Sequence, residues 1–444
     1  MNILILGCST IGSTLARQLS QEQYDVTVVD NQKQKLTKLQ EKYDIRTVLG
    51  QPSYPETLKE ANAENADIII AVSDKDEINM IACQIAHTLF KVKKKIARIS
   101  SPHYLVRNEL FGDKDLPIDI FINTERLVMN LIRECIDHPG SQQVLRFQNP
   151  QLVIASVKIQ EESEASSLMS QQLISYFPSE TAAIIALFRQ GTQQTLTDDF
   201  VLHKNDTVYF ICEHTQLDSM LKVFYPQALA SHSVIIGGGG QNGSLLAKNL
   251  SSDFRVKLIE NNRQRCFQLA HQFPDLTILH GDATDKDLLV NENIENTDLF
   301  CAMTHDDEDN LISSLQAKHL GAKNVITLVN RLDYLDIFTN NDLDVLIVPH
   351  QVVINDIFTH IHRGNFLSVH ALAKGNMEVI EVSLVPDCFF LEKPYLPSEI
   401  KLCGIIRDNK PLVIEELDQY QTHDILILLV ENASAVMKLE NLFT

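Results

Sequence analysis

A short apolar segment that runs into a glycine-rich turn occurs twice in this chain, at residues 3–12 and 234–243. A strand, a glycine turn and a helix in this order form the dinucleotide-binding fingerprint, in which the backbone closely approaches a pyrophosphate. One such motif is a weak signal, but a duplicated one with matching downstream segments predicts two nucleotide-binding units. The copies differ at the middle glycine of the fingerprint, where the second copy has Gly240 and the first has Ser9.

The repeat extends well beyond the glycines. Four further apolar segments follow each turn, namely residues 26–30, 47–50, 66–73 and 95–99 in the first copy and residues 256–260, 278–281, 297–304 and 325–329 in the second. Apolar strands that alternate with amphipathic helices predict βαβ units and a parallel, doubly wound sheet. Continuous Val/Ile/Leu runs are typical of strands that are covered on both faces.

After each copy the glycines become rarer and separate β-patterned segments appear. At 444 residues the chain is expected to hold several domains, because single cores stop growing near ~250–300 residues. The sequence therefore predicts an α/β protein with two Rossmann-like domains of doubly wound parallel sheet, each followed by a small α+β domain. We place the Rossmann-like domains at residues 1–125 and 231–352 and the small domains at residues 143–227 and 366–444.

Composition excludes some classes of function. The formal net charge of −20 argues against a nucleic-acid partner, because such a protein needs a basic face to neutralise phosphates. Eight scattered cysteines without a C-x-x-C pair favour buried free thiols in a reducing compartment over disulfides or zinc. The chain begins with an apolar strand rather than a signal peptide, and no apolar run approaches the ~18–20 residues of a membrane span. We therefore expect a cytoplasmic protein.

The glycine turns carry the predicted binding chemistry. The phosphates of a nucleotide accept hydrogen bonds from free amides at the positive end of the helix that follows. Asp30 lies 23 residues beyond Gly7, and Glu260 lies 22 residues beyond Gly238. A carboxylate at the end of the second strand binds a ribose and repels a 2′-phosphate, so we expect NAD(H) rather than NADP(H).

The residues expected to bind nucleotide at these turns are Gly7, Cys8, Ser9, Thr10, Ile11, Gly12 and Asp30 in the first copy, and Gly238, Gly239, Gly240, Gln241, Asn242, Gly243 and Glu260 in the second. The Ser9 side chain either pushes the ligand outward or replaces one amide contact with its hydroxyl. Our hypothesis is that the first site binds dinucleotide more weakly than the second, or prefers another adenine nucleotide.

Polar residues also end the fourth strand of each copy, where the far half of a dinucleotide would lie. These residues are Ser73 and Asp74 in the first copy and Thr304 and His305 in the second. Two interpretations stay open for them, nucleotide binding and capping of the helix that follows. Arg98 ends the fifth strand of the first copy, within reach of a phosphate or a neighbouring subunit.

No pattern of catalytic residues accompanies the turns. The small domains offer no clustered acid–base groups, and the chain has no nucleophile elbow, P-loop or zinc-ligand spacing. The acidic run at residues 306–309 is interpreted as a complement to a helix dipole rather than as a metal site. We therefore expect a nucleotide sensor without catalytic or metal-binding residues. An NAD-dependent oxidoreductase is the alternative.

The assembled residues resemble the TrkA family, the regulatory subunits of Trk potassium-uptake systems, which are built from tandem RCK (KTN) domains. The resemblance covers essentially the whole chain and is most specific at residues 1–7, 71–80 and 95–102, with residues 281–284 and 307–310 in the second copy. Ser9 and Ser100 depart from the family pattern, which usually has glycine and a second arginine at these positions.

The resemblance implies a cytoplasmic homotetrameric ring at the inner face of the cell membrane. The ring would dock beneath a membrane potassium-translocating subunit such as TrkH. Binding of NAD(H), or of ATP or ADP, would then bias the shape of the ring and thereby the pore. In this family the Rossmann-like pieces are the nucleotide-binding N-terminal RCK subdomains, and the small pieces are the C-terminal ones.

Overall fold

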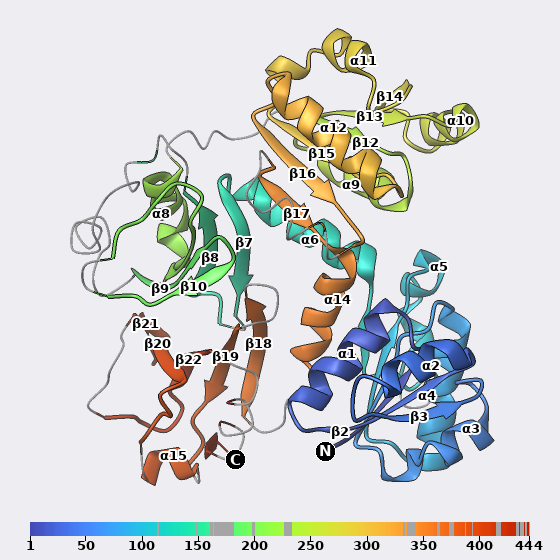
Figure 1. Cartoon of the computed structure of the whole chain (residues 1–444), viewed down its shortest axis with the longest axis vertical. Helices are drawn as coiled ribbons and strands as arrows, with labels where there is room; N and C mark the ends of the chain where they lie inside the picture. The colour runs from blue at the N-terminus through green and yellow to red at the C-terminus, as the bar shows by residue number, and fades with distance from the viewer. Residues whose placement is uncertain are drawn as a thin grey trace. The chain divides into compact units, whose positions relative to one another are not determined.

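The computed structural model describes the chain except for residues 113–114, 148, 160–162, 164–181, 198–199, 226–232, 332–333, 335–342, 362–364, 373–376, 387, 393, 414–418, 432–434, 436–438, 440–441 and 444. The described residues form two six-stranded and two five-stranded sheets (Figure 1). No helix among them is long and apolar enough to cross a membrane.

The first six-stranded sheet has the order β3-β2-β1-β4-β5-β6. Its strands are β1 (Asn2–Leu6), β2 (Asp25–Asp30), β3 (Arg46–Leu49), β4 (Ile68–Ala71), β5 (Lys94–Arg98) and β6 (Ile120–Ile122). The helices between them are α1 (Thr10–Gln21), α2 (Lys33–Gln40), α3 (Pro55–Glu60), α4 (Asp76–Phe90) and α5 (Pro102–Leu105), with short 3₁₀ turns η1 (Ala63–Asn65) and η2 (Asn108–Leu110). All its pairings are parallel, and Ile3 lies between Val26 and Ile68.

The second six-stranded sheet repeats this order as β14-β13-β12-β15-β16-β17. Its strands are β12 (Ser233–Gly237), β13 (Arg255–Glu260), β14 (Thr277–His280), β15 (Leu299–Ala302), β16 (Asn324–Leu328) and β17 (Val345–Ile347). The helices are α9 (Gln241–Leu250), α10 (Arg263–Gln272), α11 (Lys286–Asn291) and α12 (Asp307–His319), with the 3₁₀ turn η4 (Ile294–Asn296). This strand order is that of the Rossmann fold, whose crevice lies where the order reverses, beside β1 and β12.

The two five-stranded sheets have antiparallel pairings. The first, of order β10-β9-β11-β8-β7, consists of β7 (Ser141–Arg146), β8 (Leu152–Lys158), β9 (Ala182–Arg189), β10 (Thr192–Gln194) and β11 (Thr207–Glu213). The second, of order β18-β19-β22-β20-β21, consists of β18 (Phe366–Leu372), β19 (Met377–Ser383), β20 (Ile400–Arg407), β21 (Lys410–Leu412) and β22 (Ile425–Val430). The accompanying helices are α6 (Thr124–Asp137), η3 (His214–Gln216), α8 (Leu217–Phe224), α14 (Pro349–Phe358) and α15 (Phe389–Glu392).

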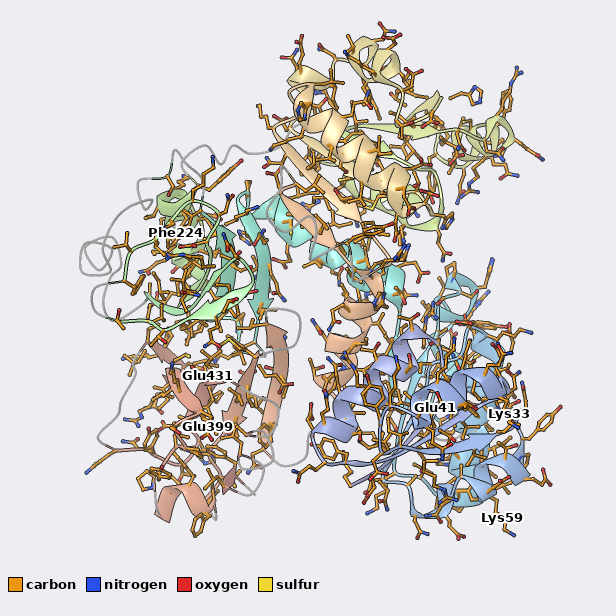
Figure 2. All side chains as sticks on the ribbon, viewed as in Figure 1. Lys33, Glu41, Lys59, Phe224, Glu399 and Glu431 are labelled. Carbon is orange, nitrogen blue, oxygen red and sulfur yellow. The ribbon has the colours of Figure 1, made fainter. Side chains whose placement is uncertain are left out.

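The predicted fold class is therefore confirmed: two doubly wound parallel sheets, each followed by a small domain with an antiparallel sheet. The two parallel sheets and the first antiparallel sheet each have a core cluster of their own. In the first small domain, Phe224 of α8 is fully buried and stacks on Phe210 of β11 at 5.5 Å between ring centroids (Figure 2). The sequence did not predict the sixth strands β6 and β17, because three residues are too short for an apolar pattern to be recognised.

Candidate functional site

The first and third glycines of both turns have the geometry that the fingerprint requires. Gly7 and Gly238 each adopt φ = +108°, a backbone conformation that is open mainly to glycine. A Cβ atom placed on Gly12 would lie 1.9 Å from the carbonyl oxygen of Gly7, and one on Gly243 would lie 1.9 Å from that of Gly238. Helices α1 and α9 therefore begin in direct contact with the end of the preceding strand, as close packing at the third glycine demands.

The turns differ at the middle position. The hydroxyl of Ser9 accepts a hydrogen bond from the amide of Gly12 at 3.5 Å and donates one to the carbonyl oxygen of Val72 at 3.3 Å. Gly240 is the N-cap residue of α9 and offers no side chain. A Cβ atom there would meet only the imidazole of His305, at 3.4 Å from Nε2. The positive end of α9 is therefore more open to an anion than that of α1.

The acid at the end of the second strand holds each turn in place. Asp30 accepts a hydrogen bond from the amide of Cys8 at 2.6 Å, and Glu260 accepts one from the amide of Gly239 at 2.8 Å. The other oxygen of each carboxylate accepts the amide two residues further along the chain, at 2.7 Å in both copies. Each carboxylate oxygen has a further lone pair, so both acids retain acceptor capacity for ribose hydroxyls.

The other residues predicted at the turns differ in their exposure to solvent. Cys8 and Ile11 are buried, whereas Thr10 and Gln241 are exposed and Asn242 is half-buried. Burial, with a contribution from Asp30, raises the pKa of the Cys8 thiol to about 11. The thiol is therefore protonated at neutral pH and is not a nucleophile.

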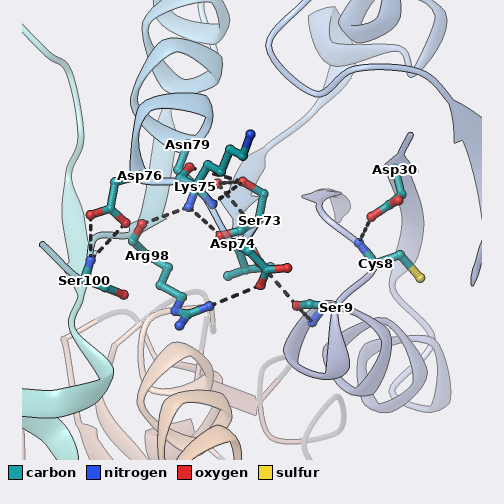
Figure 3. Close-up of polar contacts among 12 residues, drawn as sticks. Cys8, Ser9, Asp30, Ser73, Asp74, Lys75, Asp76, Asn79, Arg98 and Ser100 are labelled. Atoms are coloured by element: carbon teal, nitrogen blue, oxygen red, sulfur yellow. Dashed lines mark hydrogen bonds and ion pairs between the residues drawn. The ribbon is translucent and has the colours of Figure 1, made fainter. Parts of the chain in front are cut away.

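A buried asparagine joins the ends of the fourth and fifth strands in each copy. Asn79 donates to the carbonyl oxygens of Ser73 and Arg98 at 3.0 and 2.9 Å, and its Oδ1 accepts the Ser73 hydroxyl at 2.7 Å (Figure 3). Asn310 makes the same contacts to Thr304 and to the last residue of β16. The hydroxyls of Ser73 and Thr304 are thus directed at an asparagine side chain of the following helix, whereas the N-cap residues of α4 and α12 are Lys75 and Asp306. Sequence reasoning missed this role for the asparagines, although their recurrence in both copies was a signal.

The first acid of the helix after the fourth strand anchors the next loop. Asp76 accepts hydrogen bonds from the amides of Ser100 and Ser101 at 3.0 and 2.7 Å. Asp307 accepts hydrogen bonds from the amides of Asn330 and Arg331, in the loop after β16, at 2.8 and 3.0 Å. Among the described residues, no group of three or more His, Cys, Asp and Glu side chains is arranged to hold a metal ion. Asp307, the buried acid within residues 306–309, therefore anchors the loop that follows β16.

Arg98 and Asp74 point toward one another beside the first turn (Figure 3). Their closest atoms, Nη1 and Oδ1, are 3.7 Å apart, and 77% of the Asp74 side chain is exposed. Arg98 is much less exposed, and its Nε atom is buried without a hydrogen-bond partner in the described part of the chain. The matching position in the second copy is the buried Leu328. The first turn therefore has, at the end of the fifth strand, a guanidinium that the second turn lacks at this position.

The second turn opens into a cavity of about 620 Å³, within the size range of cofactor sites. Of the predicted residues, Gly238, Gly239, Gly240, Glu260, Thr304 and His305 line it. Its further lining includes Arg265, Asp282, Thr284 and Asp309, which sequence reasoning did not assign to the site. Arg265 donates from Nε to the carbonyl oxygen of Gly239 at 3.1 Å. The carboxyl ends of β12, β13, β14 and β15 meet at this edge, so residues after β14 were predictable members of the site.

Comparison with known proteins identifies the family. The TrkA-N domain family matches residues 3–123 and 234–349, the two stretches that contain the glycine turns and parallel sheets. The Trk system potassium uptake protein TrkA of Halomonas elongata is 37% identical over 453 residues, covering 100% of this chain and 98% of that protein. The chain belongs to the TrkA family.

Solved structures show the fold that the TrkA family shares with RCK domains. The GsuK RCK domain covers 100% of this chain and 94% of its own with a TM-score of 0.62 at 17% identity. The GsuK channel bound to NAD also has a TM-score of 0.62, at 18% identity, covering 100% of this chain and 78% of that one. At such low identity the likeness shows the fold alone.

Proposed function

We propose that this chain is the nucleotide-binding regulatory subunit of a Trk-type potassium uptake system. It binds NAD(H) at the second glycine turn and NAD(H), ATP or ADP at the first. Ligand binding controls a membrane potassium-translocating subunit of the TrkH kind. Membership of the TrkA family supports this role, as does the likeness to a channel whose structure was solved with NAD.

The observation that carries the proposal is the cavity at the second turn. Gly240 leaves a cradle that a side chain would fill, and the amides at the start of α9 would hold the pyrophosphate. Glu260 would accept hydrogen bonds from the adenosine ribose and would repel a 2′-phosphate. Asp282 and Thr284, on the loop after β14, line the same cavity as Glu260 and would contact the adenosine half of the ligand.

The first turn would take a different ligand or the same one more weakly. The Ser9 hydroxyl already serves as an acceptor at the start of α1, so one amide is less available to a phosphate. Arg98 offers donors that a terminal phosphate would attract away from Asp74, because a charged hydrogen bond to phosphate is stronger than a 3.7 Å ion pair with an exposed carboxylate. These features favour ADP or ATP at this turn.

The hydrogen bonds of Asn79 and Asp76 indicate how a ligand would act on the protein. Asn79 of α4 ties Ser73 to the end of β5, and Asp76 of α4 ties the loop that follows β5. Ligand contacts at Asp74 would therefore move the loop between β4 and α4 together with the end of β5. A nucleotide that binds one arrangement of these loops more tightly shifts the population of ring states. We propose that the ring is a homotetramer, held at the inner face of the membrane by its partner.

The test is potassium flux through the membrane subunit, co-purified with this chain and reconstituted in vesicles. We expect flux to change by at least about fivefold between nucleotide-free and NAD(H)- or ATP-saturated complexes, which corresponds to a coupling free energy of about 1 kcal/mol. We also expect no consumption of NADH. Turnover of NADH with a substrate panel, together with nucleotide-independent flux, would instead support an NAD-dependent oxidoreductase.

Exchanging the middle residues of the two turns should exchange the affinities of the two turns for NADH. Ser9→Gly is expected to tighten NADH binding at the first turn about tenfold, and Gly240→Ser is expected to weaken it at the second about tenfold. The reason is that each change frees or occupies one hydrogen bond to a charged group, worth about 1.5 kcal/mol. Calorimetric titration measures both.

Each titration isolates one site by placing aspartate at the middle position of the other turn, as Gly240→Asp or Ser9→Asp. Aspartate is a good N-cap, so the helix is retained, while its charge repels the phosphates. Unchanged affinities for both exchanges would contradict the role we assign to Ser9 and Gly240.

A further inference from the structure

A cluster of titratable side chains lies outside both glycine turns, at the end of α6. It consists of Glu134, His138, Arg146, His214 and Asp218, which we call the histidine–arginine cluster. These residues come from α6 and the position after it, from β7, from η3 and from α8 (Figure 1). The cluster thus links the end of α6 to three elements of the first antiparallel domain.

The guanidinium of Arg146 is the centre of the cluster. Nε and Nη2 bind the two carboxylate oxygens of Glu134 at 2.9 and 3.0 Å. Nη1 lies 2.8 Å from Nε2 of His214, and Nη2 lies 3.2 Å from Nε2 of His138. On its other side, His138 Nδ1 lies 2.8 Å from a carboxylate oxygen of Asp218.

These contacts require both histidines to be neutral. A guanidinium has hydrogen-bond donors and no acceptor, so an imidazole nitrogen that contacts it must present a lone pair. Nε2 of His138 and of His214 is therefore unprotonated, and Nδ1 carries the ring proton. For His138 this is the proton that the Asp218 carboxylate accepts. The geometry fits one protonation state of the pair.

Protonation of either histidine would break its contact with Arg146, and protonated His138 could bind Glu134 instead. A proton on either Nε2 would place an N–H group against an N–H group of Arg146 and bring two positive charges together. Nε2 of His138 also lies 3.7 Å from Oε2 of Glu134. Protonated His138 would therefore pull Glu134 away from Arg146, while Asp218 continues to hold the ring.

The other charged groups around the cluster do not oppose the transfer of Glu134 from Arg146 to protonated His138. Asp137 is bound to Arg133 at 2.9 Å, and Arg133 also binds Asp253 at 2.9 Å. Asp137 and Glu134 both favour the positive charge of Arg146, and the hydrogen bonds that Arg146 donates to Glu134 are the main cause of the raised pKa of Arg146. Arg146 therefore keeps its positive charge, and its donors stay directed at the two imidazole rings.

We propose that the histidine–arginine cluster is a pH-sensitive latch that holds α6 to the first antiparallel domain at neutral pH and releases it on acidification. Imidazole is the side chain whose ordinary charge change falls between about pH 5 and pH 8. A proton on Nε2 of either histidine is incompatible with its contact to Arg146, so falling pH favours release. Helix α6 directly follows the last strand of the first Rossmann-like sheet in the chain. On the proposed function, the latch makes control of potassium uptake respond to cytosolic acid.

Hydrogen exchange on the full chain tests the latch. Peptides that cover residues 134–147 and 214–221 are followed at pH 7.5, 6.5 and 5.5, with labelling times scaled for the intrinsic exchange rate. We expect the local opening equilibrium to rise at least about tenfold from pH 7.5 to pH 5.5, since each proton taken up contributes up to a factor of about ten per pH unit.

Matched variants distinguish opening of the latch from an unspecific loosening of the protein at low pH. The double variant His138→Gln/His214→Gln keeps an acceptor for Arg146 without titrating, so its opening should change less than about twofold. His271→Gln, in the last turn of α10, should keep the full response. Arg146→Gln should open these peptides at both pH extremes.

The proposal would be overturned if local opening in the wild-type chain did not depend on pH. It would also be overturned if local opening in the double glutamine variant responded to pH as strongly as in the wild type. The measurement uses the chain alone. A failure of nucleotide to control potassium flux would therefore count against the proposed function and leave the latch standing.

Discussion

Gly243→Ala is expected to abolish nucleotide binding at the second turn and to destabilise α9 by about 3 kcal/mol. The added methyl group would lie 1.9 Å from the carbonyl oxygen of Gly238, a backbone atom that cannot rotate away. Helix α9 must then shift by more than an ångström, and its first amides leave the position where they face the cavity. Titration with NADH measures the loss of binding, and hydrogen exchange of the α9 amides measures the destabilisation.

Gly240→Ala is the matched control for this prediction. The backbone at Gly240 has a negative φ of −64°, and a methyl group there meets only the end of the His305 side chain at 3.4 Å. The variant should fold as the wild type does and lose at most about tenfold in affinity. Equal effects of the two substitutions would contradict the assignment of distinct roles to the second and third glycines. Gly12→Ala should reproduce the Gly243 effect at the first turn, where the geometry is the same.

Arg189→Met is expected to destabilise the first antiparallel sheet by about 3–5 kcal/mol, because it leaves a buried carboxylate without its cation. Asp206 is 1% exposed and receives two hydrogen bonds from Arg189, at 2.9 and 2.8 Å. The same arrangement recurs in the second antiparallel sheet, where Arg407 binds Asp424 at 2.8 and 2.6 Å. Asp424 is also 1% exposed, so Arg407→Met should have a comparable effect there.

The measurement is hydrogen exchange of the β9 and β11 amides, because a chain of several domains has no single unfolding free energy. The double variant Arg189→Met/Asp206→Leu removes both charges and should recover most of the loss. Lys257→Met breaks the more exposed ion pair with Glu292 and should cost no more than about 1 kcal/mol. Equal losses for Arg189→Met and Lys257→Met would show that burial of Asp206 is not the cause.

The parallel sheets were predictable because their signal is local. Each strand is a continuous apolar run, each turn has its glycines, and each second strand ends in an acid, Asp30 or Glu260. All three features arise from residues that are neighbours in the chain or recur at the repeat spacing. The antiparallel domains were harder to define, because half-buried strands in short segments have less regular patterns. Their placement after each Rossmann-like domain was nevertheless confirmed.

The site was predictable only in part. Its backbone elements follow from the fingerprint, but the contributions of Asp282, Thr284 and Arg265 depend on which loops meet at the carboxyl edge of the sheet. The two interpretations of Ser73 and Thr304 depend on where a hydroxyl points. The structure directs both hydroxyls to the buried asparagines Asn79 and Asn310.

The amino-acid sequence by itself determined the duplicated Rossmann-like fold, the family and the difference between Ser9 and Gly240. These are properties of residue type and spacing, and spacing along a chain dictates strands, turns and helices. Only the tertiary structure decided what the side chains do. The Ser9 hydroxyl serves the start of α1, two asparagines join strand ends 19 and 18 residues away, and His138 meets Asp218 across 80 residues. The two glycine turns are therefore unequal in structure, since contacts between distant residues set how open each helix end is.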